Sequence, residues 1–479
     1  MALFPYSYVP EDVELIVPAA SEGTRDRCRF SFLRDGASGL LQLSFAEPGG
    51  AVGPIVGHAL ASRRINDLLP VVVDGANASP EALGRHLRAA HVHAPRWAGA
   101  EPVVSLVYEG DLGGDERMRA WVEAADELRR KAAVYPGETI HVVGRFKGAT
   151  VLSGARDFVI ETLALSDGRR LRYEMPEGSF SHPNGSANER SLDWLCGRLD
   201  VIAADLKRRP ALLELYCGCG NHTVALAKNC DRTVAVEIDA RLTAAATRNL
   251  AANGVDLRKA TVLTDTVGKS RLVHRVLRNA SWLEDKGEPS ERLVHFDAVL
   301  VDPPRCGIDE RTRSCLPRYG HILFVSCNPA ALARDVAVFE RTHDLAAMAV
   351  VDGFPGTPHV ECLAHFVKRL NSTQPSSVVL APAPKKPVRS LQDLALDALS
   401  DVAHELSTDA IDALDLPVAA DLIRYIVSKQ KLTTPIAMKF MKSRHTDIAA
   451  ALGHLDLVAG CNTFGPGFVP SGGGRASDF

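Results

Sequence analysis

The sequence predicts an α/β protein built around a mostly parallel sheet. After about residue 189, short apolar runs alternate with longer amphipathic stretches, and most of these runs are continuously apolar. Strands that are buried on both faces have this pattern, and their alternation with helices is typical of a parallel sheet covered on both sides. We expect a helix at residues 189–207, then strands at 212–216, 233–238, 261–264, 298–301, 322–325, 346–351 and 363–367.

The residues before this sheet predict a separate α+β domain. Residues 28–33 and 103–108 have the pattern of strands, whereas residues 116–132 have helical spacing. These elements belong to no regular alternation of strand and helix. We therefore assign residues 1–177 to an N-terminal domain and residues 178–370 to the sheet domain.

The composition changes after residue 370. Residues 371–389 are rich in Ser, Pro and Ala, which predicts an extended linker. Residues 390–458 predict a helical appendage that is acidic at first and basic over 424–444, where six Lys and Arg occur without an acid. The Gly- and Ser-rich residues 459–479 predict a disordered tail.

Composition and charge exclude several classes of protein. The 479 residues carry a net charge of −3 and are 46% apolar, unlike a strongly basic nucleic-acid binder. The ten cysteines form no CxxC pair, so they indicate free thiols in a reducing compartment rather than a metal or cluster site. No Lys or Arg precedes Arg25, and no apolar run approaches the roughly 20 residues that cross a membrane. We expect a cytoplasmic protein, with nuclear or organellar delivery left open.

A glycine loop follows the first strand of the sheet, where residues 214–221 read ELYCGCGN. Glycines let the backbone approach a cofactor closely, and Gly218 and Gly220 fit the pattern GxGxxG, although Thr223 occupies its third position. Glu237 ends the next strand, where Rossmann-like sites place the acid that binds ribose hydroxyls. The loop predicts a nucleotide-like cofactor; the alternative is a plain tight turn with an exposed acid.

Three further motifs place a thiol and two carboxylates near the ends of strands. Asp302 begins DPPR, Cys327 lies in SCNP, and Glu361 ends HVE. Active sites of α/β sheets lie at this edge, so we expect a nucleophile with possible bases beside it. Taken singly, these motifs have plainer interpretations, namely a loop after a strand, an inert core thiol, and a loop segment or metal pair with no third ligand.

Together these motifs resemble the tRNA (uracil-5-)-methyltransferase family, class I enzymes that use S-adenosylmethionine to form 5-methyluridine in RNA. The family motifs read DPPR, SCNP and a Glu two places after a His. Residues 178–184, GSFSHPN, match the segment before the family's catalytic domain, and 214–221 match its ELYCGNGN loop. The resemblance covers about residues 25–370. One residue departs from the family, because the glutamine of FxQPN is His182 in this chain.

The resemblance implies a Rossmann-like methyltransferase domain with an N-terminal RNA-binding domain and a C-terminal helical appendage. It implies that Cys327 is a nucleophile that adds to uracil C6 and that Glu361 removes the C5 proton. S-adenosylmethionine is the implied cofactor, tRNA the implied partner, and neither a metal nor a membrane is required. The implied contacts to cofactor or base are His182, Tyr216, Gly218, Asn221, Glu237 and Asp302.

The resemblance extends to the N-terminal domain and favours tRNA. Residues 104–108, VSLVY, and 141–145, HVVGR, resemble strands of the bacterial tRNA enzyme. The four-cysteine cluster and separate small β-barrel of the ribosomal-RNA relatives have no counterpart. The implied substrate is uridine 54 of the T loop. A uracil-5 methyltransferase for ribosomal RNA and a non-catalytic RNA-binding or RNA-folding protein remain alternatives, and the oligomeric state stays open.

Basic residues suggest where RNA binds. Arg25, Arg27 and Arg29 are candidate phosphate contacts on the N-terminal domain, and the basic stretch 424–444 is a further candidate. A solvated strand edge or helix face would have the same charges.

Overall fold

A computed structural model describes residues 13–16, 23–46, 52–97, 99–133, 138–284, 292–339, 341–354, 360–369 and 408–412, with single residues 422, 436, 439 and 442. The chain forms two compact units, one of residues 8–384 and one of residues 1–7 with 385–479. Within the second unit, α10 (Thr408–Asp412) is described. The predicted linker and tail, and nearly all of the predicted appendage, lie outside the described residues. Among the described helices, none has the length and apolarity needed to cross a membrane.

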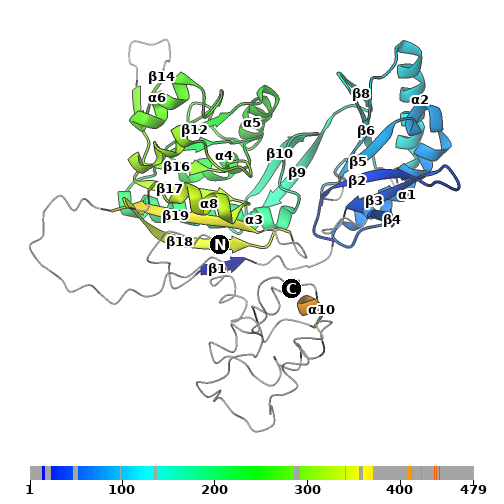
Figure 1. The fold of residues 1–479 in the computed structure, drawn as a ribbon. Helices are drawn as coiled ribbons and strands as arrows, with labels where there is room; N and C mark the ends of the chain where they lie inside the picture. The colour runs from blue at the N-terminus through cyan, green and yellow to red at the C-terminus, as the bar shows by residue number, and fades with distance from the viewer. Residues whose placement is uncertain are drawn as a thin grey trace, which may run out of the picture. The chain divides into compact units, whose positions relative to one another are not determined.

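An eight-stranded sheet forms the larger part of the first unit, with strand order β1-β18-β19-β17-β16-β11-β12-β13 (Figure 1). Its strands are β1 (Val13–Ile16), β11 (Ala211–Leu215), β12 (Arg232–Glu237), β13 (Ala260–Thr264), β16 (Ala298–Val301), β17 (His321–Ser326), β18 (His343–Val351) and β19 (Glu361–Lys368). The five strands from β17 to β13 are parallel, β19 is antiparallel to both neighbours, and β1 is parallel to β18. The prediction of a mostly parallel sheet is confirmed.

Strand order reverses between β11 and β16. Along the chain, β11, β12 and β13 extend the sheet in one direction, whereas β16 and β17 extend it in the other. Loops that leave adjacent strands in opposite directions open a crevice at the carboxyl edge, where ligands of such sheets bind.

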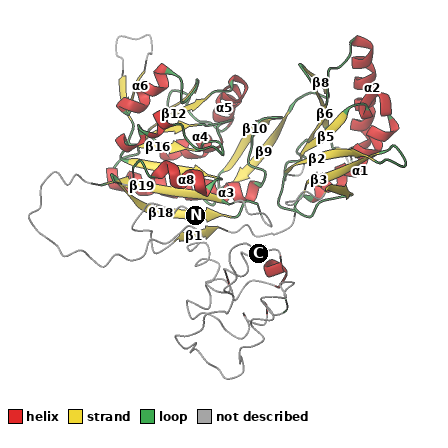
Figure 2. Ribbon diagram, in the orientation of Figure 1, coloured by secondary structure: helices red, strands yellow, loops and turns green. Residues whose placement is uncertain are grey.

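Helices and short turns connect these strands (Figure 2). The helices are α3 (Gly185–Leu206), α4 (Asn221–Leu226), α5 (Ala240–Ala252), α6 (Arg271–Asn279), α7 (Glu310–Arg313) and α8 (Pro329–Val336), with single turns at Ala227–Asn229 and Leu316–Arg318. The helix expected at 189–207 begins earlier, because the Asn184 side chain accepts a hydrogen bond from the Ala187 N–H and caps it. It ends at Lys207, which adopts a left-handed conformation with φ 55°. A two-stranded ribbon, β14 (Ser281–Glu284) and β15 (Arg292–His295), follows α6.

The N-terminal part contains a second, seven-stranded sheet with order β4-β3-β2-β5-β6-β7-β8. Its elements are β2 (Arg27–Arg34), β3 (Leu41–Ala46), β4 (Val52–Ile55), α1 (Arg63–Ala78), a turn at Pro80–Gly84, β5 (Leu87–His93), β6 (Val103–Tyr108), α2 (Asp115–Lys131), β7 (His141–Phe146) and β8 (Ala149–Ser153). The expected strands 28–33 and 103–108 and helix 116–132 are confirmed. In its core the fully buried Trp121 donates its indole N–H to the Tyr108 hydroxyl at 2.8 Å.

Two segments before residue 177 pack with the larger sheet instead. β1 extends that sheet at β18, and the hairpin of β9 (Phe158–Ala164) and β10 (Arg170–Pro176) shares its hydrophobic core. The apolar face of the hairpin includes Leu163 and the fully buried Tyr173, and this face needs the neighbouring helices to exclude water. The structure therefore joins both segments to the domain that we predict from residue 178.

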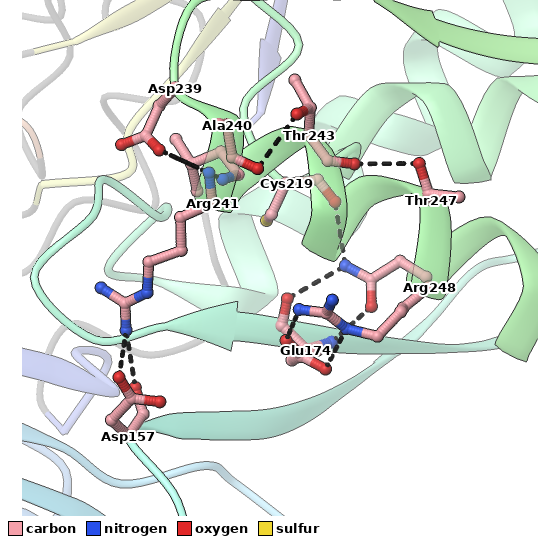
Figure 3. A network of polar contacts seen from close by, with 11 residues as sticks. Asp157, Glu174, Cys219, Asp239, Ala240, Arg241, Thr243, Thr247 and Arg248 are labelled. Carbon is pink, nitrogen blue, oxygen red and sulfur yellow. Dashed lines mark hydrogen bonds and ion pairs between the residues drawn. The ribbon is translucent and has the colours of Figure 1, made fainter. Parts of the chain in front are cut away.

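Polar contacts fix α5 between this hairpin and the glycine loop (Figure 3). Arg241 pairs with Asp157 at 2.8 Å, and Arg248 pairs with Glu174 of β10 at 2.5 Å. The Asn249 amide donates to the Cys219 carbonyl at 2.9 Å. The backbone of the glycine loop is therefore attached to a helix that the hairpin holds.

Candidate active site

The thiol and the two carboxylates singled out in the sequence meet at one edge of the sheet. Val301 pairs with Phe324 in the parallel β16–β17 ladder, so Asp302 leaves the sheet at nearly the same level as β17. In the antiparallel β17–β19 ladder Ser326 pairs with Cys362. Cys327 directly follows β17 and Glu361 begins β19, so each comes one residue beyond that pair.

The turn that carries Cys327 is closed by local hydrogen bonds. The Asn328 N–H donates to Ser326 Oγ at 3.2 Å, and the Asn328 side chain caps α8 by accepting from two backbone N–H groups. The same amide donates to the Arg305 carbonyl at 2.9 Å and so joins this turn to the DPPR loop. This geometry leaves the Cys327 side chain half-buried at the edge of the sheet.

The electrostatic environment of Cys327 disfavours the thiolate. Burial raises the pKa of the thiol, the carboxylates of Glu361 and Asp302 raise it further, and Arg305 opposes them. The resting site therefore holds a protonated thiol. A nucleophilic role requires that substrate binding or proton removal changes this balance.

Glu361 faces a histidine. The Nε2 atom of His182 lies 3.2 Å from Oε2 of Glu361. Burial opposes ionisation of Glu361, but His182 and then His222 outweigh it and lower the pKa of the carboxyl. Burial likewise opposes charge on His182, and Glu361 raises the pKa of the imidazole. Glu361 is thus held as a carboxylate, which is the state that a base requires; His359 of the same motif lies outside the described residues.

Asp302 has a different environment. Burial raises its pKa to about 7, an effect that His222 opposes and Glu361 reinforces. Within the part of the chain that the structure describes, no hydrogen bond to the Asp302 carboxyl is formed, and the residue is half-buried. An accessible carboxyl without a partner at a strand end is available to a ligand.

A second histidine–carboxylate pair lies beneath the glycine loop, and our reading of the sequence missed it. His222 Nδ1 lies 3.7 Å from Oε1 of the fully buried Glu214. Burial opposes charge on His222, but the contact with Glu214 raises the pKa of the imidazole. Thr223 donates its hydroxyl to Oε2 of Glu214 at 2.7 Å, which gives the third position of the incomplete GxGxxG a structural role. The signal in the sequence that could have revealed this pair is His222, which directly follows the glycine loop.

Residues of the glycine loop and the next strand can hold S-adenosylmethionine. Glu237 accepts hydrogen bonds from the backbone N–H groups of Gly218, Ile238 and Asp239 at 3.1, 2.8 and 3.0 Å, so its carboxylate is fixed at the end of β12. Gly218 has φ 56°, and a Cβ added there would meet no atom within 4 Å. Tyr216 adopts φ 65°, a strained conformation for a residue other than glycine, as often occurs at functional sites.

Tyr216 and Glu237 border a cavity of about 480 Å³. Tyr216, Glu237 and the exposed Ile238 form one part of its lining, and residues 266–268 and 306–309 form others. A carboxylate for the ribose hydroxyls, an apolar side chain for the adenine ring and an open glycine backbone fit the cofactor. The loops 266–268 and 306–309 were not foreseen in the sequence.

Two predicted cofactor contacts have other partners in the structure. Asn221 and Asn188 exchange two amide hydrogen bonds of 2.9 Å, which join α4 to α3. His182 contacts Glu361 and does not line the cavity beside Glu237. Direct contact of Asn221 or His182 with the cofactor therefore stays a prediction.

The Rossmann-like sheet, its glycine loop and the acid that ends the next strand define a class I S-adenosylmethionine-dependent methyltransferase. The sequence profile of the family described as tRNA (Uracil-5-)-methyltransferase matches residues 16–369. The chain belongs to this family.

Relatives agree with that assignment, and one solved structure shares the fold. The tRNA/tmRNA (uracil-C(5))-methyltransferase of Azoarcus sp. strain BH72 is 33% identical over 76% of this chain and 93% of its own length. Its counterpart from Pseudomonas paraeruginosa is 35% identical over 71% of this chain and 86% of its own. The crystal structure of Pyrococcus abyssi tRNA (uracil-54, C5)-methyltransferase with S-adenosyl-L-homocysteine aligns with a TM-score of 0.54 and 20% identity, covering 74% of this chain and 79% of the other. At that identity the likeness concerns the fold alone.

Proposed function

We propose that this protein methylates C5 of uridine 54 in the T loop of tRNA through a covalent adduct of Cys327. The observation that carries the proposal is the juxtaposition of Cys327 with an ionised Glu361 on the adjacent strand. A nucleophile and a base side by side suit a reaction that needs both in sequence. The tRNA/tmRNA uracil-C5 activity in the names of its relatives supports the choice of substrate.

The chemistry explains why both residues are needed. Uracil C5 is too weak a nucleophile to accept a methyl group directly, and addition of the Cys327 thiolate to C6 makes C5 an enolate carbon. S-adenosylmethionine supplies the methyl group to that carbon as a sulfonium. Glu361 then removes the C5 proton, the C6–sulfur bond breaks, and the electron pair returns to Cys327. Splitting one difficult step into several easier ones is the gain from covalent catalysis.

The remaining site residues have supporting roles in this proposal. Glu237, Tyr216 and Gly218 hold the cofactor, and Asn221 is a further candidate contact. Asp302 offers an accessible carboxyl without a partner and is placed to hold the edge of the base. Because its pKa is about 7, it can donate or accept a hydrogen bond near neutral pH.

RNA must reach this site with its target base extruded, because C6 of a stacked uridine is hidden from the thiol. Extruding the base costs a few kcal/mol. Phe180, just before the segment that carries His182, is 75% exposed, and an exposed ring offers a surface for base stacking. Arg29 is exposed and keeps its proposed role as a phosphate contact. Arg27 is largely buried and donates to Ser181 Oγ at 3.1 Å, so we assign it to holding that segment.

A methylation assay tests the proposal. Purified protein, labelled S-adenosylmethionine and unmodified tRNA transcripts should give 5-methyluridine, and a transcript with cytidine at position 54 should give none. Product on ribosomal RNA but not on tRNA would favour the alternative enzyme. RNA binding without product on either substrate would favour the non-catalytic protein.

A further inference from the structure

The short segment that carries His182 is held on both sides by the N-terminal sheet. The Asp26 N–H, just before β2, donates to the Pro183 carbonyl at 2.8 Å. The Gly185 N–H donates to Oδ2 of Asp26 at 2.9 Å. Together with the bond from Arg27 to Ser181, these contacts fix the backbone before and after His182.

Local hydrogen bonds also fix the imidazole of His182. The Asn184 N–H donates to its Nδ1 at 3.2 Å, so in the neutral ring the proton is on Nε2. Nε2 lies 3.2 Å from Oε2 of Glu361 and donates to that carboxylate. A doubly protonated ring also carries a proton on Nε2, so the donor toward Glu361 is present in both charge states.

Packing leaves this ring little freedom to turn away. A Cβ at Gly353 would lie 3.1 Å from Cε1 and 3.2 Å from Nε2 of His182. The ring of Phe354 lies on another side, with its centroid 5.9 Å from that of the imidazole. An alanine at position 353 would therefore require the ring to shift by a few tenths of an ångström.

We propose that His182 is a positioning residue for the base, an inference that rests on the proposed function of Glu361. By donating to Oε2, the imidazole holds the carboxylate ionised and in one orientation and leaves Oε1 for the C5 proton of the substrate. The imidazole accepts from the backbone on one side and donates to Glu361 on the other. His182 thus transmits to the base a position that the N-terminal sheet sets through Asp26 and Arg27.

This role predicts which step suffers when His182 is replaced. Addition of Cys327 and transfer of the methyl group do not need the base, whereas removal of the C5 proton does. Loss of the donor should therefore slow release of Cys327 and let the covalent RNA–protein adduct accumulate. A hydrogen bond to a charged group is typically associated with about a 10- to 100-fold effect, which sets the expected fall in turnover.

The test uses the full-length protein with tRNA transcript and S-adenosylmethionine. His182→Ala should show lower turnover and several-fold more adduct on a denaturing gel than wild type, with little change in cofactor affinity by calorimetry. His182→Gln, whose amide can donate to Glu361, should recover much of the turnover. His295→Ala, at an exposed histidine of β15, should behave as wild type.

Gly353→Ala provides an independent variant, because its Cβ displaces the ring while His182 itself remains. It should also accumulate adduct. Wild-type adduct levels in both His182→Ala and Gly353→Ala would overturn the positioning role, as would a defect confined to cofactor affinity. A wild-type protein that forms no product would instead overturn the proposed function, and the positioning role with it.

Discussion

Two carboxyl groups in different parts of the molecule have the same raised pKa. Asp26, at the start of the N-terminal sheet, and Asp302, at the end of β16, both have a pKa of about 7, with burial as the main cause. Asp26 accepts from the Gly185 N–H and lies 3.5 Å from Arg96, and its second oxygen is buried. Asp302 is half-buried and has no hydrogen-bond partner among the described residues.

The difference teaches that a raised pKa alone does not identify a functional carboxyl. Arg96 carries a permanent charge and also binds Glu189 at 2.6 Å, so Asp26 belongs to a network that joins elements of the fold. Around Asp302, by contrast, the positive charges come from the imidazoles of His222 and His182, whose charge can change with pH, and the carboxylates of Glu361 and Glu214 act against them. Accessibility and titratable partners, rather than the pKa, separate the two carboxyls.

The largest effect is expected from a variant at the sheet edge that carries Cys327, Glu361 and Asp302. This variant leaves the contacts around Asp26 unchanged. Cys327→Ala should abolish methyl transfer to tRNA, because the adduct at C6 cannot form, while tRNA binding in a gel-shift assay persists. Cys196→Ala, at a buried thiol of α3, is the matched control and should keep its activity. Normal turnover by Cys327→Ala would remove the nucleophile from the mechanism.

Glu361→Gln should also stop turnover, but with a different product. Methylation can proceed and C5 deprotonation cannot, so a slowly migrating RNA–protein adduct should appear on a denaturing gel. Glu109→Gln, at an exposed glutamate that pairs with Arg88, should show no such band. Full activity without an adduct in Glu361→Gln would contradict its assignment as the base.

Asparagine variants of the two raised carboxyls test the comparison directly. Asp302→Asn should lower the turnover number more than about tenfold, because a base-edge contact to a charged or proton-donating group is lost. Asp26→Asn should stay within a few-fold of wild type, because its side-chain oxygen can still accept from Gly185. Equal losses of turnover in the two variants would show that the distinction is wrong.

Asp26→Asn should also change how the free energy of unfolding depends on pH. Its folded-state pKa is about 7 against an ordinary 3.8, so the folded protein retains a proton that the unfolded chain loses between these values. Wild type should therefore lose stability relative to Asp26→Asn as pH rises from 5 to 7.5, by on the order of 2 kcal/mol. Denaturant unfolding at pH 5 and pH 7.5 measures this difference, and an unchanged difference would argue against the raised pKa.

The smallest effect concerns Arg27 and Arg29, two of the three arginines of β2. Arg29→Ala should weaken tRNA binding by a few-fold and lower the salt dependence of binding by about one ion, as expected for a single phosphate contact. Arg27→Ala should act mainly on the segment that carries His182. Arg63→Ala, at an exposed arginine of α1, is the control. Equal salt dependence for wild type and Arg29→Ala would exclude the phosphate contact.

Local sequence patterns determined the strands and the turns that carry the motifs. The strand at 298–301 agrees with β16 at both ends, because a continuous apolar run between an Asp and a Pro-rich turn has few alternatives. The turn at Cys327 was equally predictable, since Asn328 and Pro329 begin a helix through local hydrogen bonds. The resemblance of these motifs to the tRNA (uracil-5-)-methyltransferase family then implied the roles of Cys327 and Glu361.

Tertiary structure decided which side chains meet. His182 and Glu361 are separated by 179 positions, and they contact each other because β19 inserts antiparallel between β17 and β18 and the N-terminal sheet holds the His182 segment. Neither Asn221 pairing with Asn188 nor His222 facing Glu214 follows from spacing along the chain. Local patterns specify periodicity and turns, but hydrogen bonds between distant residues depend on the packing of whole elements. The sequence therefore pointed to the proposed nucleophile, the proposed base and the glycine loop, and the fold alone decided which histidines lie beside the carboxylates.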